Sequence, residues 1–226
     1  MSDESDSDDE EYGVQRDYRE TIGNIKKTPF SLGIELSNGE MDIMIPRNTE
    51  IPYVKTMKYK TIKDNQSKII LKVYQGERLL AKENEKLGEC ILDTIPPKTR
   101  GKVSIYATLE VREDNFFNII LKENVNGTQS ALINKINMHE DKDKNFFEKI
   151  YKEAKMHEKE DKKIIEINCK TNDLKYYCNR LKNHGNEEQK NKANQILEWT
   201  KTHLNEDIKE YDKKLNEIKN LVIKND

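Results

Sequence analysis

Hydrophobic residues in the first half of the chain recur at every second position, which is the repeat of β-strands with one buried face. The clearest runs are residues 32–36, 69–73 and 103–111. Asn38-Gly39 stands between two such runs and predicts a tight hairpin, because both residue types tolerate positive φ. Short strands at this spacing, with all five prolines between residues 27 and 126, predict an antiparallel β-sandwich.

After Ala131 the hydrophobic period changes to three and four, which is typical of one face of a helix. The clearest series is Leu204, Ile208, Tyr211, Leu215, Ile218 and Val222. Residues 146–154 and 193–200 are predicted to be helical as well. His184-Gly185-Asn186 interrupts the pattern and predicts a helix end with Gly185 as its cap. We therefore expect the α+β class, an antiparallel β-sandwich followed by an α-helical bundle.

The first eleven residues contain seven acidic residues and three serines. Such a segment cannot bury enough apolar surface to offset its ordering entropy, so we expect disorder there. Ser5 and Ser7 each have an acid three residues further on, a pattern that suits an acid-directed kinase, and phosphorylation would add more negative charge. A solubilising tail and a docking or regulatory tail are both open interpretations.

The charge balance excludes a generally basic nucleic-acid-binding protein, because 40 Lys and Arg face 42 Asp and Glu for a net charge of −2. The sequence has no apolar run long enough for a membrane-spanning helix, and it opens without the pattern of a secretory signal. Three cysteines cannot all pair within one chain and suit a reducing compartment. We expect a cytoplasmic setting, which includes the cytoskeletal assemblies within it.

Motifs for enzyme chemistry are absent from the sequence. Neither familiar glycine-rich phosphate-binding pattern occurs. His139-Glu140 and His157-Glu158 each match only half of a zinc-protease motif, and Cys169, Cys178 and His184 fit no usual metal-ligand spacing. We therefore expect no enzyme, no catalytic residues, no metal and no cofactor.

Several blocks of the strand region resemble the substrate-binding domain of the 70-kilodalton heat-shock chaperones, in that family's order and nearly at its spacing. They are Thr28–Glu35, Ile45–Pro52, Asp64–Gln66, Val73–Arg78, Leu87-Gly88, Ile95–Pro97 and Arg100-Gly101. The resemblance is strong from about Thr28 to Leu121 and looser to about Val222. Ile196–Trp199 resembles the tryptophan-bearing helix of the family's lid.

The resemblance implies an acidic tail and degenerate linker over residues 1–26, a β-sandwich peptide-binding subdomain over 27–130 and a helical lid over 131–226. The family's groove positions correspond to Leu32, Ile34, Leu36, Tyr59, Gln66, Ile69, Leu71 and Ile105. Ser37 and Ile62 occupy the two positions whose side chains arch over the bound peptide. The alternative is that some of these apolar residues, Leu32 among them, belong simply to the sandwich core.

The sequence departs from the family pattern at three features: the nucleotide-binding domain, the interdomain linker and the ion pair that holds the lid. Only 27 residues precede Thr28, where the family has its nucleotide-binding domain, and the segment Ile22–Lys27 is too polar to match the apolar interdomain linker. We therefore expect no use of ATP. In the family, Arg100 would pair with an acidic residue on the lid helix and so latch the groove shut. Leu174 aligns with that acidic position, and Asp173 directly precedes it. We therefore expect the pair Arg100–Asp173 to form the latch.

Three functions follow from the resemblance and its departures. The first is an ATP-independent module that binds extended apolar polypeptide segments. The second is a structural subunit that clamps one fixed protein partner within a larger assembly, such as a cytoskeletal one. The third is a regulator of a full-length chaperone. None involves nucleic acid, a membrane or ATP as a partner.

Overall fold

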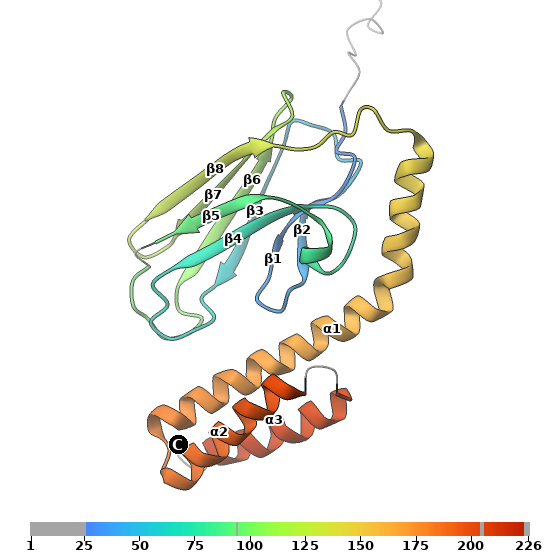
Figure 1. Ribbon diagram of the computed structural model, residues 1–226. Coiled ribbons are helices and arrows are strands. Elements are labelled where there is room, and N and C mark those ends of the chain that lie inside the picture. Colours follow the sequence, from blue (N-terminus) through green and yellow to red (C-terminus); the bar gives the residue numbers. More distant parts are fainter. Residues whose placement is uncertain (1–25, 94, 204–205, 224–226) are drawn as a thin grey trace, which may run out of the picture.

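The computed structural model describes residues 26–93, 95–203 and 206–223, so the acidic segment at the start of the sequence lies outside the described residues. The described part forms a β-sandwich followed by helices (Figure 1), which confirms the α+β class. Its elements are β1 (Leu32–Glu35), β2 (Met41–Ile45), β3 (Tyr53–Lys60), β4 (Ile69–Gln75), a short 3₁₀ helix η1 (Ala81–Glu83), β5 (Glu85–Leu92), β6 (Ser104–Val111), β7 (Phe116–Glu123), β8 (Gln129–Lys135), α1 (Lys144–His184), α2 (Glu187–Thr202) and α3 (Ile208–Ile223).

Two four-stranded antiparallel sheets make the sandwich, with strand orders β2-β1-β4-β5 and β3-β6-β7-β8. One apolar core lies between them, because strands bury every second side chain. On β6 the buried inward row is Ile105, Ala107, Leu109 and Val111. The predicted alternation over residues 103–111 is thus confirmed.

The predicted hairpin joins β1 to β2. Leu36 N donates to Glu40 O at 2.9 Å, and Gly39 N donates to Leu36 O at 2.9 Å. Gly39 has a φ of +83°, a conformation that glycine adopts without steric cost. The Asn38 side chain braces the turn by accepting from Glu40 N.

The second sheet continues past Ala131, where the sequence pattern predicted a change to helix. β8 pairs with β7 from Gln129 opposite Lys122 to Lys135 opposite Phe116, so that expectation is wrong, and residue 130 falls within a strand. β8 is an edge strand, and of its residues Leu132 packs against the sandwich core. Most residues of β8 are exposed, and some of its inward positions are polar. Hydrophobic residues therefore do not alternate regularly along it, and the sequence pattern did not predict a strand.

The helical region confirms the predicted helix end with Gly185 as its cap and shows two further caps. The Asp143 side chain accepts from Phe146 N at 3.0 Å and begins α1, which ends at His184 directly before Gly185. Asn186 and Gln189 form a reciprocal capping box at the start of α2. The second half of α1 packs with α2 and α3 around a core of Leu174, Cys178, Leu181, Ala193, Ile196, Tyr211, Leu215, Ile218 and Val222. Leu204 lies outside the described residues.

The first half of α1 packs against the edge of the sandwich. Phe30 lies 5.4 Å from Phe147 and 5.9 Å from Tyr151, measured between ring centroids. Tyr151 Oη donates to Pro29 O at 2.9 Å, and the Arg47 guanidinium lies 3.9 Å from the centre of the Tyr151 ring. One continuous helix therefore links the sandwich edge to the bundle, which lies across the end of the sandwich that carries the β1–β2 hairpin (Figure 1).

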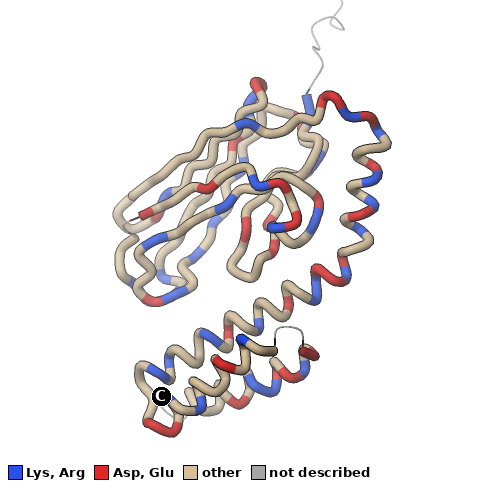
Figure 2. The backbone as a smooth tube through the Cα atoms, in the orientation of Figure 1, with Lys and Arg blue, Asp and Glu red and all other residues tan. Residues whose placement is uncertain are grey.

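Basic and acidic residues are interspersed along the first part of α1 (Figure 2), and after Asp173 its charged residues are Lys175, Arg180 and Lys182. Among the cysteines, Cys90 and Cys178 are buried and Cys169 is exposed, and burial raises the pKa of the Cys178 thiol to about 12.

Within residues 26–93, 95–203 and 206–223, no group of three His, Cys, Asp or Glu side chains is placed to hold a metal ion. The helices of the same residues include none that is both long and apolar enough to cross a bilayer.

Candidate peptide-binding site

A cavity of about 770 Å³ lies between the open end of the sandwich and the second half of α1. Its walls come from β1, β4 and the end of β3, and from the loops that follow β1 and β3. Cys169, Asn172 and Asp173 of α1 cover it. Nine of the ten predicted binding residues line this cavity: Ile34, Leu36, Ser37, Tyr59, Ile62, Gln66, Ile69, Leu71 and Ile105.

Strand register places the apolar part of the cavity at one end of the sandwich. β1 runs antiparallel to β4, with Ile34 opposite Val73, so Leu36 and Ile69 lie toward the same end. Burial increases along β4 from the partly buried Ile69 to Leu71 at 5% exposed and Val73 at 0%. The same inward row of side chains therefore lines the cavity at one end and forms the core at the other.

Leu32 is the predicted binding residue that does not line the cavity. It stands at the other end of β1, opposite Gln75 of β4, and its side chain is fully buried in the sandwich core. Leu32 and Ile34 share one face of the strand, but only Ile34 is close enough to the open end to reach the cavity. Leu32 therefore takes the alternative role that the sequence left open, as a core residue.

Tyr59 connects the two sheets at the cavity wall. Its hydroxyl donates to Asp42 Oδ2 at 2.7 Å, which joins β3 of one sheet to β2 of the other. Burial raises the pKa of the Tyr59 phenol above its usual range, and the hydrogen bond and negative charge of Asp42 raise it further. Tyr59 is therefore a neutral hydrogen-bond donor with its ring facing the cavity.

The two predicted arch positions sit in loops with different supports. Ser37 O accepts from Asn172 Nδ2 of α1 at 2.8 Å, and the neighbouring Asn38 O accepts from Asn168 Nδ2 at 2.8 Å. Ile62, whose residue is 44% exposed, has its backbone N–H bonded to Gln66 Oε1 at 2.9 Å. Gln66 thus shapes the β3–β4 loop, while the lid helix holds the β1–β2 loop.

The predicted latch residues lie close to each other at the rim. Arg100 Nη2 is 3.9 Å from Asp173 Oδ1, with the two side chains 37% and 46% exposed. The Arg100 guanidinium also lies 4.2 Å from the centre of the Tyr176 ring. Leu174, the residue that aligned with the family's acid, is fully buried in the helical bundle and cannot face Arg100.

A second ion pair joins the lid to the sandwich further back along α1. Arg78 donates from Nε to Asp161 Oδ2 at 3.0 Å and from Nη2 to Asp161 Oδ1 at 2.7 Å. Burial by itself would raise the pKa of Asp161, but the hydrogen bonds and charge of Arg78, with backbone N–H groups of Leu79 and Leu80, lower it below its usual value. The carboxylate is therefore held charged in a fully buried position.

Comparison with known proteins bears on this arrangement of sandwich, cavity and covering helix. A family model described as Hsp70 protein matches residues 24–225. The chain belongs to the Hsp70 family.

Relatives of this chain include proteins named as chaperones. The chain is 35% identical over 164 residues to the chaperone protein DnaK of Thermotoga petrophila, which covers 70% of this chain and 27% of that protein. It is 42% identical over 135 residues to the chaperone protein dnaK of Cyanidium caldarium, which covers 60% of this chain and 22% of that protein. The chain therefore spans about a quarter of the length of these relatives.

Several residues of this Hsp70-family site were not predicted from the sequence. Asp42, Asn168, Asn172 and Cys169 line or brace the cavity, and the Asn38 amide donates to Cys169 Sγ at 3.2 Å. One local signal was present: Asn168 and Asn172 are four residues apart, so they share one face of a helix. That spacing indicates a polar stripe on α1, but it does not say which loop the stripe meets.

Proposed function

We propose that this Hsp70-family domain is a substrate-binding unit that holds one extended apolar polypeptide segment in the cavity between the sandwich and α1. In this proposal the sandwich module is the peptide-binding subdomain and the helices are its lid. The observation that carries it is the composition of the cavity. Aliphatic side chains of Ile34, Leu36, Ile69, Leu71 and Ile105 form its inner wall, and polar loop residues form its rim.

The chemistry of such a cavity favours broad selectivity and moderate affinity. Burying one leucine side chain contributes about 2 kcal/mol, and about five backbone hydrogen bonds contribute roughly 1 kcal/mol each. Further apolar contacts must offset an association cost of at least about 4 kcal/mol. Micromolar binding, near −8 kcal/mol, is therefore the upper limit that we expect for segments with a central aliphatic residue.

Binding in this proposal is independent of ATP and involves no catalysis. Both the cavity wall and its cover come from residues 34–173 of this chain, so an equilibrium complex can form from these parts alone. The free thiols of Cys90, Cys169 and Cys178 are consistent with a reducing, cytoplasmic location, which belongs to the same proposal.

The test is fluorescence anisotropy of a labelled heptapeptide with a central leucine, titrated with the full chain. We expect a low-micromolar Kd that does not change when Mg²⁺ and ATP are added. Ile69→Asp places a charge on the cavity wall and should weaken binding at least tenfold, about 1.4 kcal/mol or more. Absence of binding by the folded wild-type chain would contradict the proposal.

Ile133→Asp is the matched control for Ile69→Asp. Ile133 is also an isoleucine on a strand, but it is 57% exposed on β8 and lies outside the cavity. It should leave the Kd within twofold of wild type. Equal loss of affinity in both variants would show a general effect of added charge and would not support the cavity as the binding site.

A second candidate function is a structural subunit that clamps one fixed partner segment. The ties that hold α1 over the cavity favour it, since the Arg78–Asp161 ion pair and the Asn168 and Asn172 hydrogen bonds must all break before the helix can lift. Many ties slow release and suit a partner that stays bound. Co-purification separates the two functions: one stoichiometric partner indicates the clamp, whereas many clients at low occupancy indicate the general module.

A further inference from the structure

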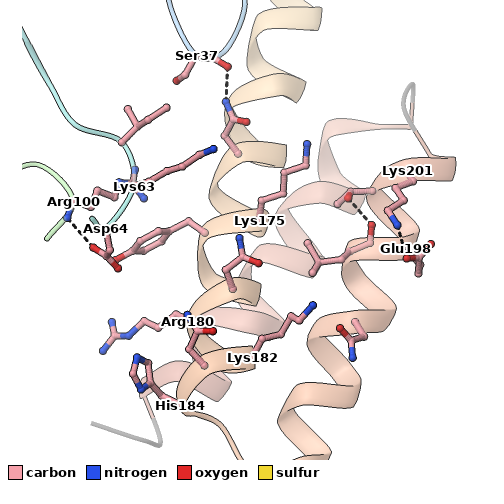
Figure 3. A pocket seen from close by; sticks show the side chains of 18 residues that line it. Ser37, Lys63, Asp64, Arg100, Lys175, Arg180, Lys182, His184, Glu198 and Lys201 are labelled. Atoms are coloured by element: carbon pink, nitrogen blue, oxygen red, sulfur yellow. Dashed lines mark hydrogen bonds and ion pairs between the residues drawn. The ribbon is translucent and has the colours of Figure 1, made fainter. Parts of the chain in front are cut away.

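A second cavity, of about 1040 Å³, lies beside the first and between the sandwich and the lid. The loop after β3 forms one wall, and the second half of α1 with α2 forms the others (Figure 3). Six of the eighteen residues that line it are Lys or Arg: Lys63, Arg100, Lys175, Arg180, Lys182 and Lys201. Asp64 and Glu198 are the only acidic residues that line it among those the structure describes.

Part of this positive charge has no ion-pair partner among the residues that the structure describes. Lys201 pairs with Glu198 at 2.6 Å and Arg100 approaches Asp173. In contrast, no carboxylate among the described residues forms an ion pair with Lys63, Lys175 or Lys182. Like charges that share one concave surface repel one another and attract an anionic ligand. The cavity is thus positive although the chain as a whole has a net charge of −2.

We propose that the acidic segment Asp3–Glu11 of this same chain binds in this basic cavity. The segment has seven carboxylates and no basic residue, so its charge is complementary to the lysines of the cavity. Its binding would be electrostatic and would need no fixed conformation of the segment. Phosphorylation at Ser5 or Ser7 would add negative charge and strengthen the contact.

The tether between the segment and the domain is long enough for this contact. Residues 12–25 separate Glu11 from Lys26, where the described structure begins. Fully extended, that tether spans roughly 50 Å. Lys26 O accepts from Ile51 N just before β3, and the eight residues of β3, roughly 27 Å long, separate that point from the loop that carries Lys63. Because the segment is tethered, its binding is intramolecular and does not depend on the concentration of the protein.

The walls of the basic cavity belong to two parts of the molecule. Lys63 and Arg100 extend from loops of the sandwich, whereas Lys175, Lys182 and Lys201 extend from the lid. A bound acidic segment would therefore contact both parts. The contact itself does not depend on whether the neighbouring cavity binds peptide.

Carbodiimide cross-linking of the full chain tests the contact, because it joins a carboxylate directly to a lysine amine. We expect cross-links from residues 3–11 to Lys63, Lys175, Lys182 and Lys201, several-fold above those to Lys152 and Lys159. Lys152 and Lys159 are exposed lysines on the first half of α1, outside the cavity. Raising NaCl from about 0.1 M to about 1 M shortens the Debye length from about 10 Å to about 3 Å and should abolish the preference.

Mixing isotopically labelled and unlabelled chains separates contacts within a chain from contacts between chains. Cross-links that join only unlike copies would overturn the proposal in favour of a second copy's segment. Cross-links spread evenly over all exposed lysines, Lys152 and Lys159 included, would overturn it as well.

Charge-reversal variants provide an independent test. The double variant Lys175→Glu/Lys182→Glu should reduce cross-links to the remaining Lys63 and Lys201 several-fold. The matched double variant Lys152→Glu/Lys159→Glu, with the same seven-residue spacing on the same helix, should leave them unchanged. All four lysines are exposed, so the melting temperature should be similar in both variants. If cross-links to Lys63 and Lys201 form in Lys175→Glu/Lys182→Glu at the wild-type level, the proposed contact is refuted.

Discussion

Arg78 and Asp161 are 83 residues apart in sequence and form a two-pronged ion pair in which the Asp161 side chain is fully buried. Arg78 follows β4, and Asp161 lies in the middle of α1. The planar guanidinium matches both carboxylate oxygens, which gives the pair directional specificity in addition to charge. The pair therefore sets the position of the lid helix along the edge of the sandwich.

Replacing Asp161 should loosen this attachment. Asp161→Asn keeps the shape but removes the charge and one acceptor, and we expect a loss of about 2 kcal/mol of stability. Urea unfolding measures the loss, and hydrogen exchange of α1 amides near residue 161 should become faster than exchange in β6. Glu160→Gln, at an exposed neighbouring position, is the control and should change stability by less than about 0.5 kcal/mol. Equal effects of the two substitutions would contradict this role for Asp161.

The same pair predicts a dependence on acid. The folded-state pKa of Asp161 lies below its unfolded value, so its contribution is fully present above the unfolded pKa of about 3.9 and is lost as pH falls through the folded pKa. The stability difference between wild type and Asp161→Asn should be constant from about pH 7 to 5 and should shrink below about pH 4. Urea titrations across this range measure it; a difference that grows in acid would reverse the assigned sign.

Leu32 and Ile69 should respond to truncation in opposite ways. Leu32→Ala empties a fully buried core position and should cost about 2–5 kcal/mol, with little direct effect on peptide affinity in the fraction that remains folded. Ile69→Ala shortens a partly buried cavity side chain and should weaken heptapeptide binding more than it lowers stability. Thermal unfolding and anisotropy on both variants separate the effects. The prediction fails if Leu32→Ala weakens binding while stability stays unchanged.

Arg100 should influence the rate of peptide release more than stability. Its ion pair with Asp173 is more than a third exposed on both sides, so it contributes less than about 1 kcal/mol to folding. Arg100→Ala also removes the stacking on Tyr176, and we expect several-fold faster dissociation of a bound peptide. Stopped-flow competition with unlabelled peptide measures this rate.

Arg100→Lys is the informative control for that experiment, because it keeps the positive charge and loses the planar stacking. An intermediate release rate would assign part of the effect to Tyr176 and part to Asp173. Release at the wild-type rate from Arg100→Ala would show that these contacts do not restrain the lid.

Local sequence patterns predicted much of the fold because the responsible interactions are local. The Asn38-Gly39 turn, the end of α1 before Gly185 and the alternation on β6 each depend on residues within a few positions of one another. β8 was missed for a related reason. Its one residue packed on the sandwich core, Leu132, cannot establish an alternating pattern, and only its pairing with β7 makes it a strand.

The amino-acid sequence by itself determined the α+β class, which follows from periodicity, and the family blocks, which follow from motif. The resemblance carried by those blocks implied nine residues that line the cavity. Tertiary structure alone decided that Leu32 belongs to the core and Ile69 to the cavity, because the two have the same alternating pattern and differ only in their distance from the open end. It also decided that Asp161 meets Arg78 and that five lysine and arginine side chains join Lys63 around one cavity. Those contacts arise when the lid packs on the sandwich, and side chains so far apart in sequence leave no local pattern of their meeting.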